Sequence, residues 1–141
     1  MESYVFRRAI CGIPSNSMNK TFSNLYKSVQ KDRYVESVKA SLQLLESYKR
    51  FPSDSEFEKE IVLKDVCNFR SRNYLLSKLE NDKRKELVNV DNYTIEHVMP
   101  QNPNLSEEWR LMLGENWKAI QESYLHTIGN LTLTGYNSEL S

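Results

Sequence analysis

The sequence predicts a mainly α-helical fold with a small β element, in which a helical N-terminal part precedes a strand–loop–strand–helix unit. Through residues 17–90 apolar side chains recur at helical spacing, which is typical of amphipathic helices. After Asn89, β-branched and aromatic residues gather in short runs bounded by Pro, Asn and Gly, which indicates strands and turns. With 141 residues, 39% of them hydrophobic, the chain can bury a core without disulfide or metal cross-links.

Two amphipathic helices are expected first, over residues 17–31 and 34–50. Ser17 is a candidate N-cap for the first of them, since its hydroxyl could accept a hydrogen bond from the first turn. Ser53 or Ser55 could cap a third helix, and Glu56 follows Ser53 at the spacing of a capping box. We therefore predict that a third helix begins there.

One long helix and a strand-containing unit are predicted for the rest of the chain. Apolar positions favour a helix over residues 67–88. Strands are expected over residues 93–98 and 130–134. Between these strands we expect two short helices, which begin near Ser106 and Trp117.

Composition bears on where the protein works. No apolar run approaches the roughly 20 residues of a membrane helix, and the N-terminus lacks the layout of a signal peptide. We therefore expect a cytoplasmic protein with no membrane partner. The two cysteines, Cys11 and Cys67, form no CxxC pair and have no nearby histidine in the sequence, so we expect free, partly buried thiols and no structural zinc site.

Charge is unevenly distributed along the chain, although the formal net charge is zero. Residues 1–90 carry 17 basic and 12 acidic side chains, a net charge of +5, and residues 91–141 carry 2 basic and 7 acidic ones, a net charge of −5. If DNA is the ligand, the helical part or a further domain must therefore supply much of the phosphate contact.

The residues with chemical potential gather after residue 90: Glu96 and His97 on the first strand, Asn130 at the head of the second, and Asn137 in the predicted first turn of a final helix. Phosphodiester hydrolysis needs a base, a cation and a scaffold that aligns them. His97 titrates near neutral pH and suits the base. The side-chain carbonyl of Asn137 suits Mg²⁺. Asn130 is placed to tie the loop to the strand through side-chain-to-backbone hydrogen bonds.

Several roles stay open from the residues alone. A regular strand sends Glu96 and His97 to opposite faces. That geometry lets Glu96 reach a metal from behind the base, and it equally permits a surface residue. His126 could contact phosphate or stabilise the leaving group, or it could serve packing or capping in the loop. Gln101 is assigned the turn after Pro100 and no catalytic role.

Three separated motifs resemble the C-terminal nuclease domain of the GmrSD-type restriction proteins: TIEHVMPQ at residues 94–101, IGNLTLTGY at 128–136 and NSELS at 137–141. The family pattern runs (D/E)-H-(I/V)-x-P-Q, then G-N-L-T-L, then N-x-x-L-S. Residues 2–12 also resemble the segment that joins the two domains of such proteins.

This resemblance implies an HNH (ββα-metal, or His-Me finger) endonuclease in the variant form His-Asn-Asn. It makes His97 the general base, Asn130 the residue that shapes the loop, and Asn137 and Glu96 the ligands of one Mg²⁺ or Mn²⁺. The implied role is restriction and antiviral defence, with double-stranded DNA, modified DNA included, as substrate.

The resemblance also implies a domain organisation. Residues 1–16 are expected to link to a missing nucleotide-dependent N-terminal domain of the same protein, which is also a partner. Residues 17–90 form the helical part, and residues 91–141 form the HNH motif. We expect its last helix to be truncated, because one helical turn is not stable alone.

Two other functions compete with the endonuclease. One is a catalytically inactive relative that binds DNA or a protein, which the acidic residues after position 90 favour. The other is a plain helical interaction module, which the joint occurrence of three motifs disfavours.

Overall fold

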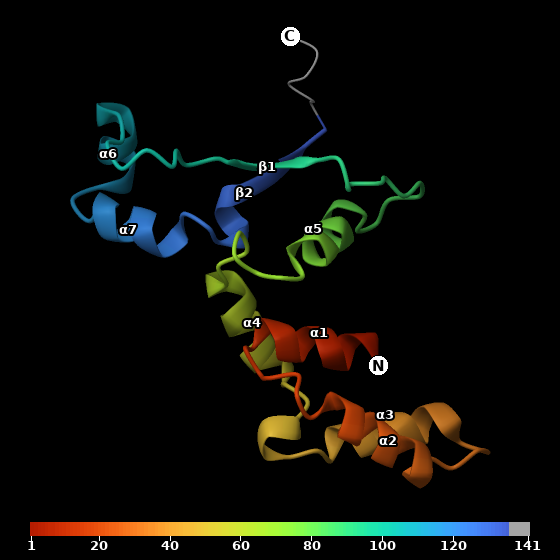
Figure 1. The fold of residues 1–141 in the computed structure, drawn as a ribbon. Coiled ribbons are helices and arrows are strands. Elements are labelled where there is room, and N and C mark those ends of the chain that lie inside the picture. The colour runs from red at the N-terminus through yellow and green to blue at the C-terminus, as the bar shows by residue number, and fades with distance from the viewer. Residues whose placement is uncertain (136–141) are drawn as a thin grey trace. The chain divides into compact units, whose positions relative to one another are not determined.

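The computed structural model of the chain describes residues 1–135 (Figure 1). These residues are mainly helical, with seven α-helices and one two-stranded antiparallel sheet, which confirms the predicted fold class for the described part. The chain divides into two compact units, Met1–Ile61 and Val62–Ser141. The predicted last helix begins at Asn137 and lies outside the described residues.

The first unit consists of helices and the loops that connect them. Its elements are α1 (Glu2–Ile10), α2 (Met18–Ser28), α3 (Tyr34–Gln43), the 3-10 turn η1 (Ser47–Lys49) and most of α4 (Asp54–Leu63). Its core forms around three buried side chains, Tyr4, Leu25 and Leu42, one from each of the first three helices. Partly buried hydrophobic residues complete this core: Phe22, Val29, Val38, Leu45 and Phe51.

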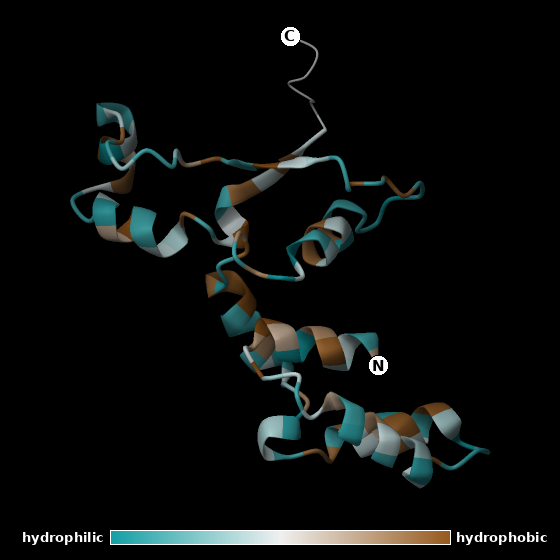
Figure 2. Cartoon of the chain, in the orientation of Figure 1, coloured by the Kyte–Doolittle hydropathy of each residue, from teal (hydrophilic) through white to brown (hydrophobic). Residues whose placement is uncertain are grey.

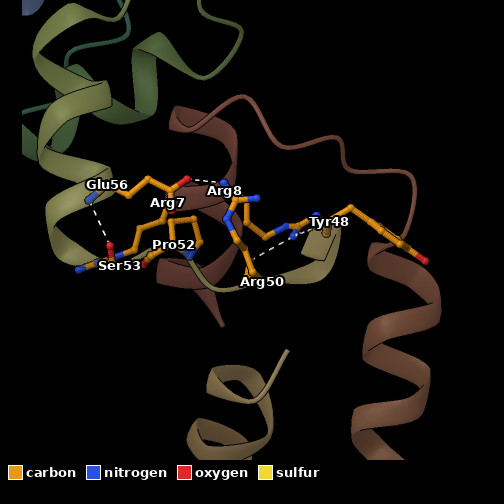
Figure 3. A network of polar contacts seen from close by, with 7 residues as sticks. All are labelled: Arg7, Arg8, Tyr48, Arg50, Pro52, Ser53 and Glu56. Atoms are coloured by element: carbon orange, nitrogen blue, oxygen red, sulfur yellow. Dashed lines mark hydrogen bonds and ion pairs between the residues drawn. The ribbon is translucent and has the colours of Figure 1, made fainter. Parts of the chain in front are cut away.

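Helix α1 lies within residues 1–16, the segment expected to link to a further domain, and it is packed into the first unit. Arg8 on this helix is fully buried. Its guanidinium donates hydrogen bonds to the carbonyls of Tyr48 (2.8 Å), Arg50 (3.3 Å) and Pro14 (2.9 Å). Figure 3 shows Arg8 among the residues that follow α3. A buried cation needs such partners, so Arg8 fixes the path of these loops around α1.

Next to Arg8, a second group of polar contacts holds the start of α4 (Figure 3). Arg50 forms an ion pair with Glu56. The backbone N–H of Glu56 donates to the hydroxyl of Ser53 (3.2 Å), which confirms the predicted cap. Ser17 is the N-cap residue of α2, as predicted, but its hydroxyl makes no capping hydrogen bond and is buried instead.

Two predicted helices are too long. The helix expected over residues 34–50 ends at Gln43, and the backbone then leaves helical geometry, with Ser47 at a φ of 54°. The helix expected over residues 67–88 is reduced to α5 (Arg72–Glu80).

The shortening of α5 has a cause at each end. Asp65 accepts a hydrogen bond from the N–H of Asn68 (3.0 Å), and this local turn competes with a helix. At the other end the Asn81 amide bonds both the N–H (2.7 Å) and the carbonyl (3.0 Å) of Val88, so the chain folds back on itself.

The second unit contains the sheet. Strand β1 (Thr94–His97) pairs antiparallel with β2 (Leu131–Thr134), with His97 opposite Leu131 and Thr94 opposite Thr134. Figure 1 shows that the chain leaves the sheet at the end of β1, passes through α6 (Glu107–Leu113) and α7 (Trp117–Tyr124), and returns through η2 (Ile128–Asn130) to β2. Both short helices were predicted, and Ser106 caps α6 by accepting from the N–H of Trp109.

The core of the second unit comes from α5 and from loops around the sheet. Its buried hydrophobic side chains include Val66, Leu75, Leu76, Met99 and Leu105. Figure 2 shows hydrophobic and hydrophilic residues interleaved along the helices. None of the helices that the structure describes combines the length and the apolar character needed to span a membrane.

Candidate active site

Strand β1 presents its two predicted site residues to different surroundings. Thr94 and Glu96 are exposed, whereas Ile95 and His97 are partly buried. The alternation agrees with the expected opposite faces. The hydroxyl of Thr94 lies 3.4 Å from a carboxylate oxygen of Glu96, on the exposed face.

His97 is held at both ring nitrogens. Its Nδ1 lies 2.8 Å from the side-chain amide nitrogen of Gln101. Its Nε2 lies 3.1 Å from Nδ1 of His126 and 3.7 Å from Sγ of Cys67. The two imidazole rings meet edge to face, with their planes at 79°. The ring of His97 is therefore fixed in orientation by three side chains.

Of these neighbours, Gln101 and Cys67 were missed as site residues, whereas the role of His126 was left open. Gln101 was assigned only to a turn, and packing was the alternative for His126. We expected Cys67 to have no histidine partner, and no histidine is near it along the sequence. This expectation is wrong for the folded chain, because His97 lies 3.7 Å from its sulfur. Cys67 and His97 are 30 residues apart, and His97 and His126 are 29 residues apart, so no local motif could group them. Cys67 is a free, half-buried thiol, as expected.

The backbone joins the segments that carry Cys67 and His126. The N–H of Val66 donates to the carbonyl of His126 (2.8 Å). Thr127 is buried, and its hydroxyl donates to the carbonyl of Tyr124 (2.9 Å), which closes the end of α7. These bonds place the two side chains beside each other at the end of β1.

Asn130 ties the loop after β1 to the segment before β2. Its side-chain oxygen accepts from the N–H of Met99 (2.7 Å), and its amide donates to the carbonyls of Leu125 (2.8 Å) and Met99 (3.4 Å). Its own carbonyl accepts from the N–H of Val98 (2.9 Å). The hydrogen bonds predicted for this residue are thus present, and its part in catalysis stays a prediction.

Gln121, on α7, supports the same loop and was not anticipated. It is buried, and its amide donates to the carbonyls of Pro100 (2.8 Å) and Asn102 (3.0 Å). The sequence signal that could have identified Gln121 is its position, as a polar side chain on the inward face of an amphipathic helix. Asn130 and Gln121 together fix the backbone that follows His97.

The surroundings of His97 change its proton affinity. Partial burial lowers the pKa of His97 below the usual histidine value, and the neighbouring His126 lowers it further, while Glu96 opposes both effects. Burial raises the pKa of the Cys67 thiol, and Asp65 adds to this effect. At neutral pH both groups are therefore held mainly in their uncharged forms.

A pocket of about 450 Å³ opens beside His97. Polar and charged side chains from α5 and from the segment before β1 line part of it, among them Arg72, Asn73 and Asp91. Apolar walls come from Leu76 and Leu133. The pocket gives His97 access to a solvent-borne ligand, with a cation within the same lining.

The sequence profile of the GmrSD restriction endonucleases, C-terminal domain, matches residues 51–141. The chain belongs to this family. The curated proteins and the solved structures contain no significant match. Membership of the GmrSD C-terminal domain family gives the chain a restriction-endonuclease-related role.

A divalent cation is implied by this family, and the described residues offer two kinds of donor. Glu96 presents an exposed carboxylate, the hard oxygen donor that Mg²⁺ prefers. Cys67, His97 and His126 offer one sulfur and two imidazole nitrogens, which Mg²⁺ does not prefer. The carboxylate thus fits Mg²⁺ in its chemistry, and Asn137, the other predicted ligand, lies outside the described residues.

Proposed function

We propose that this GmrSD C-terminal domain is a metal-dependent DNA endonuclease in which His97 is the general base. The observation that carries the proposal is the setting of His97, which is oriented at both nitrogens, has a lowered pKa and faces a pocket. A base of this kind is unprotonated at neutral pH and is held ready for an incoming water.

The residues of the chain would divide the work as follows. With the Gln101 amide turned so that its oxygen accepts a proton from Nδ1, the lone pair of His97 lies on Nε2, 3.1 Å from Nδ1 of His126. An attacking water that takes the place of His126 at this nitrogen would give its proton to Nε2. Arg72, in the lining of the pocket, would bind a phosphate oxygen. Asn130 and Gln121 would keep the loop after His97 in place.

The cation would be Mg²⁺ or Mn²⁺, held by Glu96 and Asn137, and when bound it would neutralise charge on the scissile phosphate and the leaving oxygen. We further propose double-stranded DNA, modified DNA included, as the substrate, and restriction or antiviral defence in the cytoplasm as the setting. A nucleotide-dependent domain of the same protein, joined through residues 1–16, would control cleavage.

Nicking of supercoiled plasmid tests this proposal. The protein is incubated with unmodified and modified plasmid in Mg²⁺ or Mn²⁺, and the nicked fraction is followed over time. Loss of a general base lowers a rate by about 10²–10⁴-fold, so His97→Ala is expected to fall in that range. Asn137→Ala should also lose activity, and its loss should be partly offset by a higher concentration of metal.

Glu122→Ala is the matched control, since Glu122 is an exposed residue of α7. It should nick at the wild-type rate. If His97→Ala nicks DNA as fast as the wild type does, the assignment of His97 is wrong. A chain that binds plasmid and leaves it supercoiled would instead support the inactive DNA-binding alternative.

A further inference from the structure

Three metal-binding side chains converge at the end of the sheet from three separate segments. Cys67 precedes α5, His97 ends β1 and His126 follows α7. Their donor atoms all lie within 4.8 Å of one another. The N–H of Val66 bonded to the carbonyl of His126 anchors two of the segments, and Gln101 fixes the third at the ring of His97.

The distances fit a tetrahedral ion. Zinc binds cysteine sulfur at about 2.3 Å and histidine nitrogen at about 2.0–2.1 Å, so tetrahedral angles place sulfur and nitrogen about 3.6 Å apart and two nitrogens about 3.3 Å apart. Here Sγ of Cys67 is 3.7 Å from Nε2 of His97, and that nitrogen is 3.1 Å from Nδ1 of His126. These two pairs are within about 0.2 Å of the expected edges, and the sulfur of Cys67 lies within 4.8 Å of the His126 nitrogen.

The donor set selects a class of ion. Cys67 would lose its thiol proton to solvent on binding an ion, and one thiolate with two imidazoles favours Zn²⁺ and related transition metals over Mg²⁺ and Ca²⁺. All three residues are only half-buried, and Cys67 and His97 also line the pocket, so a water molecule or a substrate atom has access to a fourth position.

We propose that Cys67, His97 and His126 form a three-ligand site for a divalent transition metal ion of the Zn²⁺ class, with the fourth coordination position open. Its ligands differ from Glu96 and Asn137, the residues proposed to hold Mg²⁺. Gln101 is its positioning residue, because it holds the ring of His97 through the nitrogen that does not bind the ion. An ion on Nε2 of His97 would occupy the lone pair that the proposed base needs, so the metal-bound site and the base of the proposed function exclude each other. Binding of the ion is therefore tested without DNA.

Titration of the reduced, metal-free protein with Co²⁺ provides the test. Co²⁺ replaces Zn²⁺ in such sites and reports its ligands through its absorption spectrum. We expect one ion per chain, a near-ultraviolet charge-transfer band from the thiolate, visible bands of a four-coordinate ion, and displacement by Zn²⁺. Gln101→Ala should weaken binding by about 10-fold, as outer partners of metal ligands do.

Cys67→Ser should lose the charge-transfer band, whereas Cys11→Ser, at the second cysteine, should keep it. His126→Gln should keep some thiolate contact but bind at least about 10-fold more weakly. Tryptophan emission verifies that each variant is folded. A wild-type protein without the charge-transfer band, or a band that survives in Cys67→Ser or disappears in Cys11→Ser, would overturn the proposal. None of these readouts depends on nuclease activity.

Discussion

Replacement of Asn130 by alanine should destabilise the second unit without touching its hydrophobic packing. The variant deprives the N–H of Met99 and the carbonyl of Leu125 of their partners. Met99 and Asn130 are both at least nine-tenths buried, so the N–H loses a hydrogen bond that water cannot replace. A buried group left unpaired costs about 1–3 kcal/mol, and the half-buried carbonyl of Leu125 costs less. We expect a total loss of about 2–4 kcal/mol.

Urea unfolding followed by tryptophan emission measures this loss. The only two tryptophans, Trp109 and Trp117, both lie in the second unit, so the signal reports on that unit alone. With a urea dependence of about 2 kcal/mol per molar, the midpoint should fall by about 1–2 M.

Asn104→Ala, an exposed asparagine in the same loop, is the matched control and should stay within about 0.5 kcal/mol of wild type. Asn130→Asp keeps an acceptor for the N–H of Met99 but loses the donor to the carbonyls, and it should be destabilised as well. An Asn130→Ala protein as stable as the Asn104→Ala control would refute the argument that these hydrogen bonds hold the loop.

Two further predictions follow from other contacts. The metal-free protein has only two histidines, so its imidazole NMR signals are few, and His97 should titrate below the usual value of about 6.5. Its pKa should move upward in His126→Ala, and a wild-type value above 6.5 would contradict the effect of burial. In the first unit, Arg8→Ala should cost about 2–4 kcal/mol, seen as earlier loss of far-ultraviolet circular dichroism with unchanged tryptophan emission, while the exposed Lys20→Ala should be neutral.

The parts of the fold that the sequence predicts are those set by local chemistry. The caps at Ser53 and Ser106 depend on residues three positions away, and both are present. The ends of α5 depend on side chains that bond the backbone instead of allowing the helix to continue, as Asn81 does with Val88. Apolar periodicity carries no information about this competition, so the predicted helix was too long.

The residues of the candidate site also differ in how far local sequence identifies them. His97 and Asn130 stand within recognisable motifs, and their residue types indicate their chemistry. Cys67 and His126 stand in no motif with His97, and only the folding of the chain brings their donor atoms to it. Arg8 illustrates the same limit in the first unit, because a charged residue near the N-terminus gives no local sign that it will be buried.

The long connection between β1 and β2 has a consequence for the order of folding. His97 pairs with Leu131 only after the whole segment with α6 and α7 has been drawn together. Closing such a loop costs entropy before any strand contact compensates for it, so local helices form before the strands meet. A chain emerging from the ribosome therefore carries His97 long before it carries β2 and His126. We therefore expect the two imidazoles to come together only after α6 and α7 have formed, and not in a chain that still lacks β2.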